Sequence, residues 1–417
     1  MRKNYAIKSI RGREILDSKG NPTLKVYLET EDNESSFSVP AGVSEGKYEA
    51  LDIRDNDKNR YFGKGVRRAV EKINRIIAPK LKGEDVTKQE KIDRLLIKLD
   101  GTNQKSNLGG NTILGVSVAS LKAAAEVKKI PLWNIVSRIF FKDKKKISRL
   151  PLPSVLLIEG ALHGGNDLQF QEFMIIPQLK EIEENIRSAA EIYHTLKTIL
   201  KEKYGATATN VGLEGGFAPP LNKAEKALDV IMAAIKKSNY LSEVKIAIDV
   251  AASTFFQKNS YKFENKFFTG SGLLNYYSEI SKNYPVASIE DPYFEEDWEN
   301  FKLITQKLKN KVTIFGDDLL ATNPERIKRA AKLNACNGLI LKPDQIGTVT
   351  EAIEAARLAR QNKWKIMVSH RGGDTCDSFI ADFAVGIEAD FTKFGAPSRG
   401  ERVARYNRLL EIVEELS

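Results

Sequence analysis

The feature that most constrains the fold is a series of short apolar runs, each ending on a charged or polar residue and each followed by a segment of helical character. The runs reach Asp249, Glu290, Asp317, Lys342 and the pair His370 and Arg371. Subtracting successive positions gives steps of 41, 27, 25 and 28 residues, the period of repeating strand–helix units in a parallel sheet. The length of this region, residues 150–417, suits one barrel of the TIM type.

The first third of the chain follows a different pattern. Apolar residues alternate with polar ones over 24–28 and 37–39, which predicts strands of an antiparallel sheet with one solvated face. Apolar residues at helical spacing over 66–77 predict a helix that closes at Pro79, and the alanine-rich stretch 113–127 predicts a packed helix. This part of the chain is therefore expected to be α+β.

Together these patterns predict an N-terminal α+β capping domain over residues 1–135, a linker over 136–149 and a catalytic (β/α) barrel over 150–417. The linker contains the densest basic cluster, "KDKKKISR" at 142–149. A solvated linker is favoured over a binding patch, because the cluster has no interleaved aromatic residues. Elsewhere the basic residues that give a net charge of +10 are dispersed among acids, so a nucleic-acid partner is not favoured.

Several classes of protein are not favoured by the sequence. It has no run of 18 apolar residues and no charged-then-apolar leader, so we expect no membrane partner and a cytoplasmic location. The two cysteines, Cys336 and Cys376, are too few for a disulfide framework and lack the spacing of a zinc site.

The charged strand ends indicate a site rather than solvated surface. In a TIM-type barrel the C-terminal ends of the strands meet around one mouth, so Asp249, Glu290 and Asp317 are expected to converge. Clustered carboxylates repel one another unless a divalent cation neutralises them, and oxygen-only ligation favours magnesium over zinc. Lys342 directly follows a buried apolar run, where a lysine is costly to desolvate. Any one of these residues could be an ordinary solvated charge at a strand end. Five successive strand ends that carry such residues favour a functional centre.

Several long motifs carry a more specific signal. In chain order they are "ILDSKGNPTLKVYLET", "DGTNQKSNLGGNTILGVSVA", "HGGNDLQFQEFMIIP", "VGLEGGFAP", "SIEDPYFEEDW", "GDDLLATNP", "LKPDQIGT", "VSHRGGDT" and "KFGAPSRGERVARYNRLLEI". Together they resemble the motifs of the enolase (phosphopyruvate hydratase) family, along essentially the whole chain. The resemblance implies a modified barrel that opens with a β-β-α-α arrangement.

The resemblance also implies a reaction and its principal groups. The reaction is the reversible dehydration of 2-phospho-D-glycerate to phosphoenolpyruvate, a step of glycolysis and gluconeogenesis. The tightly held Mg²⁺ would be bound by the three strand-end carboxylates, Asp249, Glu290 and Asp317. Lys342 would be the general base, the role that a lysine or histidine is known to have beside magnesium in enolase-superfamily sites. A neutral amine near physiological pH requires a lowered pKa, which partial burial and nearby metal ions would give. Glu214 would be the general acid that helps the hydroxyl leave, with Glu172 as its partner.

The remaining implied roles concern substrate binding. His370 and Arg371 would hold the phosphate and neighbouring groups, and Lys393 would meet the carboxylate side. Gln171 lies beside Glu172, and His163 lies in a loop that can close over the substrate. The small-residue segments 39–47 and 159–167 are expected to act as lids that exclude water. The family resemblance further implies a homodimer or a larger homo-oligomer.

The chain departs from the family pattern at several positions: Ala41, Glu159, Gly160, Ala161, Leu213, Asp344 and Gly372. Ala41 replaces a usual serine of the first lid, which puts the affinity for a second Mg²⁺, bound with substrate, in question. Asp344 adds a negative charge that is expected to raise the pKa of Lys342. These departures keep two alternatives open: another metal-dependent lyase of the enolase superfamily, and a non-catalytic enolase-like binding protein.

Overall fold

The N-terminal part of the computed structural model is built on a three-stranded antiparallel sheet. The strands are β1 (Ser9–Leu16), β2 (Pro22–Glu29) and β3 (Glu34–Ser38). One face of the sheet packs on the helix α4 (Gly110–Lys128), where Gly115 allows close approach, since a Cβ there would lie 2.6 Å from a methyl group of Val26. The predicted strands and the predicted alanine-rich helix are confirmed. The structure describes residues 5–42, 46–142 and 147–416.

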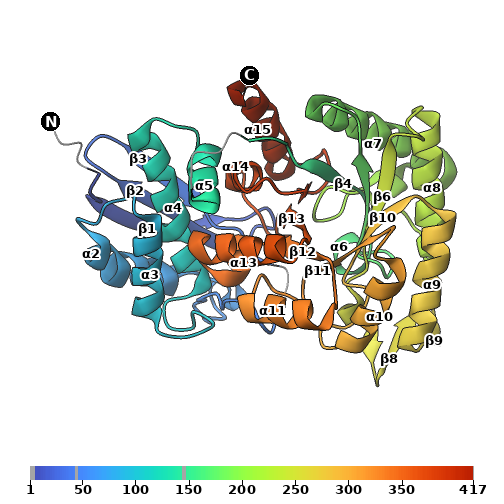
Figure 1. The fold of residues 1–417 in the computed structure, drawn as a ribbon, viewed down its shortest axis with the longest axis horizontal. Coiled ribbons are helices and arrows are strands. Elements are labelled where there is room, and N and C mark those ends of the chain that lie inside the picture. The colour runs from blue at the N-terminus through green and yellow to red at the C-terminus, as the bar shows by residue number, and fades with distance from the viewer. Residues whose placement is uncertain (1–4, 43–45, 143–146, 417) are drawn as a thin grey trace.

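Most of the other helices of this part pack on the sheet or on α4, and the last of them leads towards the barrel (Figure 1). The other helices are η1 (Tyr61–Gly63), α1 (Arg67–Lys72), η2 (Ile73–Ile77), α2 (Ala78–Leu81), α3 (Gln89–Asp100) and α5 (Leu132–Phe141). The prediction of a helix end at Pro79 is wrong, because the helix continues through the proline to Leu81. A π-helical turn precedes the proline, and in it Ala78 N–H bonds to Ile73 O. This register accommodates a proline, which has no N–H to donate.

The C-terminal part is a closed barrel with the strand order β10-β11-β12-β13-β14-β4-β5-β6. The strands are β4 (Leu152–Glu159), β5 (Glu172–Pro177), β6 (Val244–Asp249), β10 (Val286–Glu290), β11 (Thr313–Gly316), β12 (Gly338–Leu341), β13 (Lys365–Ser369) and β14 (Phe391–Lys393). Only β5 runs antiparallel to its two neighbours. Along the chain, the long helices α7 (Ile182–Tyr204) and α8 (Ala224–Lys237) lie between β5 and β6. The α/β fold class and its β-β-α-α opening are therefore confirmed.

Helices surround the barrel, and a small sheet projects from it (Figure 1). The remaining helices are α6 (Ala161–Gly164), η3 (Ala206–Thr209), η4 (Ala252–Phe255), α9 (Gly270–Asn283), α10 (Trp298–Leu308), α11 (Pro324–Leu333), α12 (Pro343–Ile346), α13 (Val349–Gln361), α14 (Phe379–Gly386) and α15 (Gly400–Leu416). The small sheet comprises β7 (Phe256–Gln257), β8 (Ser260–Phe263) and β9 (Lys266–Phe268). The predicted strand-end residues fall at or just beyond the C-terminal ends of parallel barrel strands: Asp249, Glu290, Asp317, Lys342, His370, Arg371 and Lys393. Glu172 instead begins the antiparallel strand β5, and Glu214 lies in the loop that follows α7 and η3.

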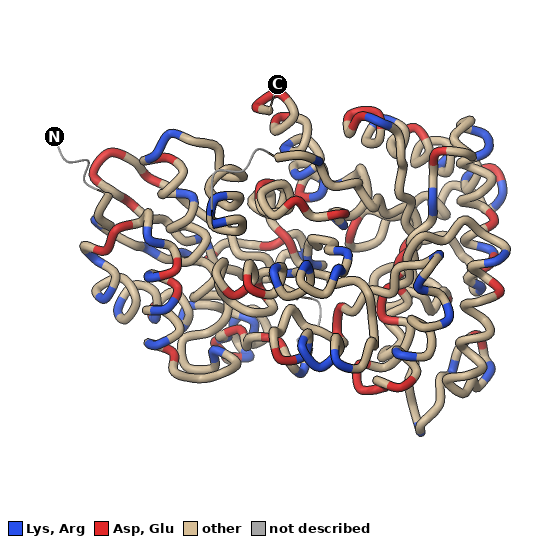
Figure 2. The backbone as a smooth tube through the Cα atoms, in the orientation of Figure 1, with Lys and Arg blue, Asp and Glu red and all other residues tan. Residues whose placement is uncertain are grey.

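The domain limits stay a prediction, and α5 runs through the predicted boundary at 135/136. Parts of the predicted linker (143–146) and of the first lid (43–45) lie outside the described residues. Figure 2 shows acidic and basic residues interspersed over both parts of the molecule. Within the described ranges, no helix is long and apolar enough to cross a membrane. The cytoplasmic location also stays a prediction.

Polar contacts dock the N-terminal part against the barrel beside the strand ends. Ala41 exchanges two backbone hydrogen bonds with Gly373. The Glu49 carboxylate accepts hydrogen bonds from both Nη atoms of Arg371, each at 2.9 Å. Lys105 Nζ lies 2.8 Å from Glu351 Oε1 in a largely buried ion pair. These contacts bring residues far apart in the chain to the same end of the barrel.

Candidate active site

One cavity at the C-terminal mouth of the barrel gathers nearly all the predicted site residues. It has a volume of about 110 Å³. Its lining includes His163, Gln171, Glu172, Glu214, Asp249, Asp317, Lys342, His370, Arg371 and Lys393. Glu290, the other predicted metal ligand, does not line the cavity, but its carboxylate lies 2.9 Å from the Lys393 ammonium. Strand ends and the loops after them thus assemble a single polar centre.

Lys393 lies at the middle of the buried carboxylates. Its Nζ lies 2.9 Å from Asp249 Oδ2, 2.9 Å from Glu290 Oε1 and 3.1 Å from Glu172 Oε1. Burial alone would lower the pKa of Lys393, but these carboxylates raise it well above its ordinary value. Lys393 is therefore a fixed positive charge in the site.

Lys342 is held by the strand-end carboxylate next to it. Its Nζ donates a hydrogen bond to Asp317 Oδ2. Burial acts to lower the pKa of Lys342, but the adjacent Asp317 carboxylate raises it above its ordinary value. The lowered pKa that the sequence predicts for Lys342 is therefore not found as long as Asp317 accepts this hydrogen bond. Asp344, whose charge was expected to raise this pKa, forms its ion pair with Arg371, with Oδ2 2.8 Å from Nη1.

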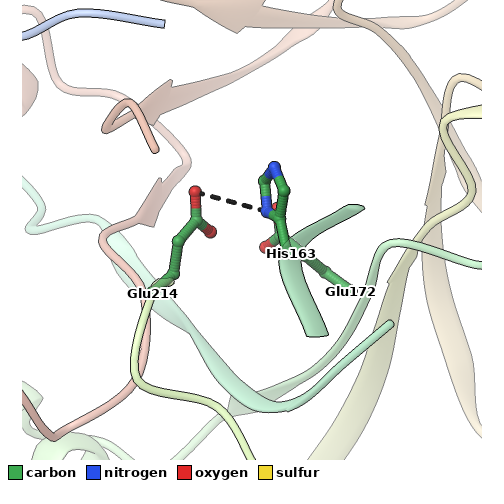
Figure 3. A group of neighbouring side chains, drawn as sticks. All are labelled: His163, Glu172 and Glu214. Carbon is green, nitrogen blue, oxygen red and sulfur yellow. Dashed lines mark ion pairs between the residues drawn. The ribbon is translucent and has the colours of Figure 1, made fainter. Parts of the chain in front are cut away.

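A second group of side chains faces the cavity from β5 and from the loops after β4 and α7. Figure 3 shows His163, Glu172 and Glu214 converging, with ligand atoms all within 4.8 Å of one another. Glu214 Oε1 lies 3.6 Å from His163 Nδ1, and its Oε2 lies 3.2 Å from His370 Nε2. Among the described residues, His163 Nδ1, Glu214 Oε2 and His370 Nε2 have no hydrogen-bond partner, and neither has Glu172 Oε2. Buried polar atoms without partners mark a place prepared for a ligand.

The titration behaviour of this group is set by burial and by its neighbours. Burial raises the pKa of Glu172 to about 8, against the opposing effect of Lys393. Burial also acts to raise the pKa of Glu214, but the nearby histidines hold it well below its usual range. Burial lowers the pKa of His370 to about 4. At neutral pH Glu172 is therefore protonated, Glu214 is ionised and His370 is neutral.

Arg402 fixes the orientation of His370 and was not identified from the sequence. Its Nη1 lies 2.7 Å from His370 Nδ1. Because a guanidinium can only donate, Nδ1 is the acceptor and the imidazole proton lies on Nε2, which faces Glu214. Arg402 is fully buried and lies in the last quoted motif, "KFGAPSRGERVARYNRLLEI", which was the available signal.

Carboxylates outnumber cationic side chains in the cavity. The lining carboxylates are Glu49, Glu172, Glu214, Asp249, Asp291, Asp317 and Asp318, and the lining cations are Lys342, Arg371 and Lys393. Burial and neighbouring carboxylates raise the pKa of Glu290 well above its ordinary value and that of Asp318 to about 7. Mutually repelling, buried oxygen ligands are the chemistry of a divalent-cation site. The residues present fit Mg²⁺.

Three of these acidic residues were missed in the sequence. Asp291 and Asp318 directly follow two predicted ligands, and with Asp317 they form a group compact enough to share an ion. The Asp291 carboxylate also accepts backbone hydrogen bonds from Asp317 and Asp318, so it supports the end of β11. Glu49 comes from the N-terminal part, and its only sequence signal is its place just after the first lid.

A closed barrel with buried ionisable groups around one mouth, and with a carboxylate cluster able to hold a cation, has the architecture of an α/β-barrel enzyme. Residues 7–136 match the family model described as "Enolase, N-terminal domain", and residues 147–417 match "Enolase, C-terminal TIM barrel domain". The chain belongs to the enolase family.

Curated relatives agree with this assignment along almost the whole chain. It is 48% identical to "Enolase" of Mastigamoeba balamuthi, over 98% of this chain and 96% of the relative. It is 48% identical to "Enolase B" of Dictyostelium discoideum, over 99% and 95%, and 47% identical to "Enolase" of Methanopyrus kandleri, over 99% and 96%. The expected enzyme class, a lyase of the phosphopyruvate hydratase type, is confirmed.

Proposed function

We propose that the chain interconverts 2-phospho-D-glycerate and phosphoenolpyruvate, with Lys342 as the general base and Glu214, assisted by Glu172, as the general acid. The observation that carries this proposal is the single cavity in which a buried amine faces the same space as a buried carboxyl pair. Dehydration of this substrate needs both groups: one takes the proton from C2 and the other protonates the departing 3-hydroxyl.

Asp249, Glu290 and Asp317 are the proposed Mg²⁺ ligands. When bound, Mg²⁺ supplies positive charge that stabilises the negative charge gained by the substrate carboxylate on loss of the C2 proton. Asp291 and Asp318 lie close enough to add oxygen ligands. A second Mg²⁺ bound with substrate remains part of the proposal, and Ala41 is the departure that bears on its affinity.

Lys342 becomes a base once its amine loses the proton that Asp317 stabilises. Asp317 is the principal cause of the raised pKa of Lys342, whereas burial and the nearby Arg371 and Lys393 all lower it. If Asp317 and Glu290, the two carboxylates that raise this pKa, are both committed as cation ligands, burial, Arg371 and Lys393 act to lower it. A neutral Nζ can then accept the C2 proton.

The departing hydroxyl group receives its proton from the carboxyl pair. At neutral pH Glu172 holds a proton and the neighbouring Glu214 does not, so the pair shares one proton between two buried carboxyl groups. We infer that Glu214 delivers this proton to the 3-hydroxyl, which leaves as water. The proton gained by Lys342 and the proton lost by the pair balance in each turnover.

The cationic and polar residues around the cavity are suited to an anionic substrate. The planar guanidinium of Arg371 and the Nε2–H of His370 are proposed to bind the phosphate and neighbouring groups. Lys393 is proposed to bind the carboxylate side. Gln171 orients Asp249 through a 3.1 Å hydrogen bond, and His163 comes from the loop that is expected to close.

The direct test follows the ultraviolet absorbance of the enol phosphate with purified protein, 2-phosphoglycerate and a magnesium series. We expect a magnesium-dependent rise. A flat trace from folded, magnesium-binding protein would overturn the proposal and favour another superfamily lyase, or a non-catalytic binding protein. The homodimer or larger assembly also stays a proposal, and light scattering on the same sample tests it.

A further inference from the structure

The carboxyl group of Glu159, the last residue of β4, is buried against the loop that carries Glu214. Glu159 Oε1 accepts hydrogen bonds from Glu214 N at 3.0 Å and from Gly216 N at 2.6 Å, and its Oε2 lies 3.2 Å from Glu214 N. The side chain is fully buried. The backbone of Glu159 also bonds to Phe217 O, so the strand end and the loop are joined by main chain and side chain together.

The loop 212–216 folds closely around this carboxyl group. A Cβ placed on Gly212 would lie 2.5 Å from Glu159 Oε2, and one placed on Gly216 would lie 3.0 Å from Glu159 Cγ. The loop is closed on itself by a 2.9 Å hydrogen bond from Gly212 N to Gly216 O. The two glycines therefore leave the space that the Glu159 side chain fills.

Glu159 has no cationic partner among the residues that the structure describes. Burial and the nearby Glu214 raise the pKa of Glu159 to about 9. At neutral pH the group is an uncharged hydrogen-bond acceptor beside an ionised Glu214. An ionised Glu159 would instead place a second negative charge beside the acid pair.

The contacts of Glu214 show what this arrangement fixes. The hydrogen bond to Glu214 N holds the backbone from which its side chain extends between His163 and His370. Leu213, another departure from the family pattern, precedes it in the same loop. Because reacting groups must be held closely to their productive geometry, a small shift of this loop would misplace the acid.

We propose that Glu159 is a positioning residue for the general acid: as a buried acceptor it fixes the loop 212–216 and thereby aims Glu214 at the departing hydroxyl. This inference rests on the proposed function of Glu214. The inference predicts different effects on the two proton transfers. Glu159 should affect loss of the hydroxyl but not removal of the C2 proton by Lys342, which it does not contact.

The test compares two variants of nearly equal size. Glu159→Gln keeps an uncharged acceptor for the two N–H groups, and Glu159→Met removes it. Two rates are measured in D₂O: formation of phosphoenolpyruvate, and exchange of the C2 proton of 2-phosphoglycerate, which reports the base alone. We expect Glu159→Gln to keep both rates within about threefold, and Glu159→Met to lose about 10- to 100-fold in phosphoenolpyruvate formation while exchange falls much less.

Equal losses of both rates in Glu159→Met would overturn the inference, as would an unchanged rate of phosphoenolpyruvate formation. If thermal melting shows that Glu159→Met does not fold, Glu159→Asp decides the same question, because it retracts the acceptor by about 1.5 Å. A wild-type protein that neither exchanges the C2 proton nor forms phosphoenolpyruvate would overturn the proposed function itself, a result distinct from an equal loss in the variants.

Discussion

Removing the charge of Asp344 should strengthen substrate binding. The Arg371 guanidinium offers five N–H donors; Glu49 accepts hydrogen bonds from Nη1 and Nη2, and Asp344 Oδ2 forms an ion pair with Nη1 at 2.8 Å. A phosphate on the free edge would lie roughly 6 Å from the Asp344 carboxylate, a repulsion of about 3 kcal/mol per unit charge at an effective dielectric constant of about 20. Relaxation and screening reduce this to about 1–2 kcal/mol, a 5- to 30-fold lower KM for Asp344→Asn.

The assay is steady-state kinetics on 2-phosphoglycerate at saturating magnesium, with the exposed Asp229→Asn as the matched control. Burial raises the pKa of Asp344 to about 6, so the carboxylate opposes phosphate binding above pH 6 and this opposition fades as pH falls through 6. The ratio of the wild-type KM to that of Asp344→Asn should therefore be large at pH 8 and approach one near pH 5. A higher KM in Asp344→Asn would refute the reasoning and show that Asp344 orients Arg371 for the phosphate.

Three further predictions address the base, the lid and the domain contact. Lys342→Ala should lower kcat about 100- to 10,000-fold while calorimetry still detects magnesium and substrate binding; unchanged turnover would contradict its role as the base. Ala41→Ser should lower the magnesium concentration needed for activity, and equal magnesium requirements of the two proteins would contradict this. Lys105→Met should cost about 1–3 kcal/mol of stability, because Glu351 loses its buried partner; an unchanged melting temperature would contradict this.

The strand ends of the barrel could be predicted because their pattern is local. A buried parallel strand must be apolar and must stop where a polar group reaches the mouth, so the residue after the apolar run identifies the position. Asp249, Glu290, Asp317 and Lys342 were all found in this way. The helix end at Pro79 was wrong for a related reason: proline usually ends an α-helix, and the π-helical turn that accommodates it leaves no clear mark in the sequence.

The electrostatic state of the site could not be predicted, because it depends on distances across the barrel. The sequence indicates that Lys342 is buried, which lowers the pKa of a lysine. It does not indicate that Asp317 accepts a hydrogen bond from this amine, which reverses the direction of the shift. In the same way the sequence does not indicate that Asp344, expected to act on Lys342, forms a direct ion pair with Arg371 and interacts with Lys342 only through its charge.

Glu49 shows why the barrel alone does not complete the site. It is 322 positions from Arg371 in the chain, and only docking of the N-terminal part brings the two together. In an isolated barrel the Arg371 guanidinium would keep only Asp344 as a carboxylate partner, and the backbone pairing of Ala41 with Gly373 beside it would be lost. The N-terminal part therefore helps to set the charge that an incoming phosphate meets. Since Glu49 lies just after the segment expected to close over the substrate, it links that segment to the guanidinium whose free edge an incoming phosphate would meet.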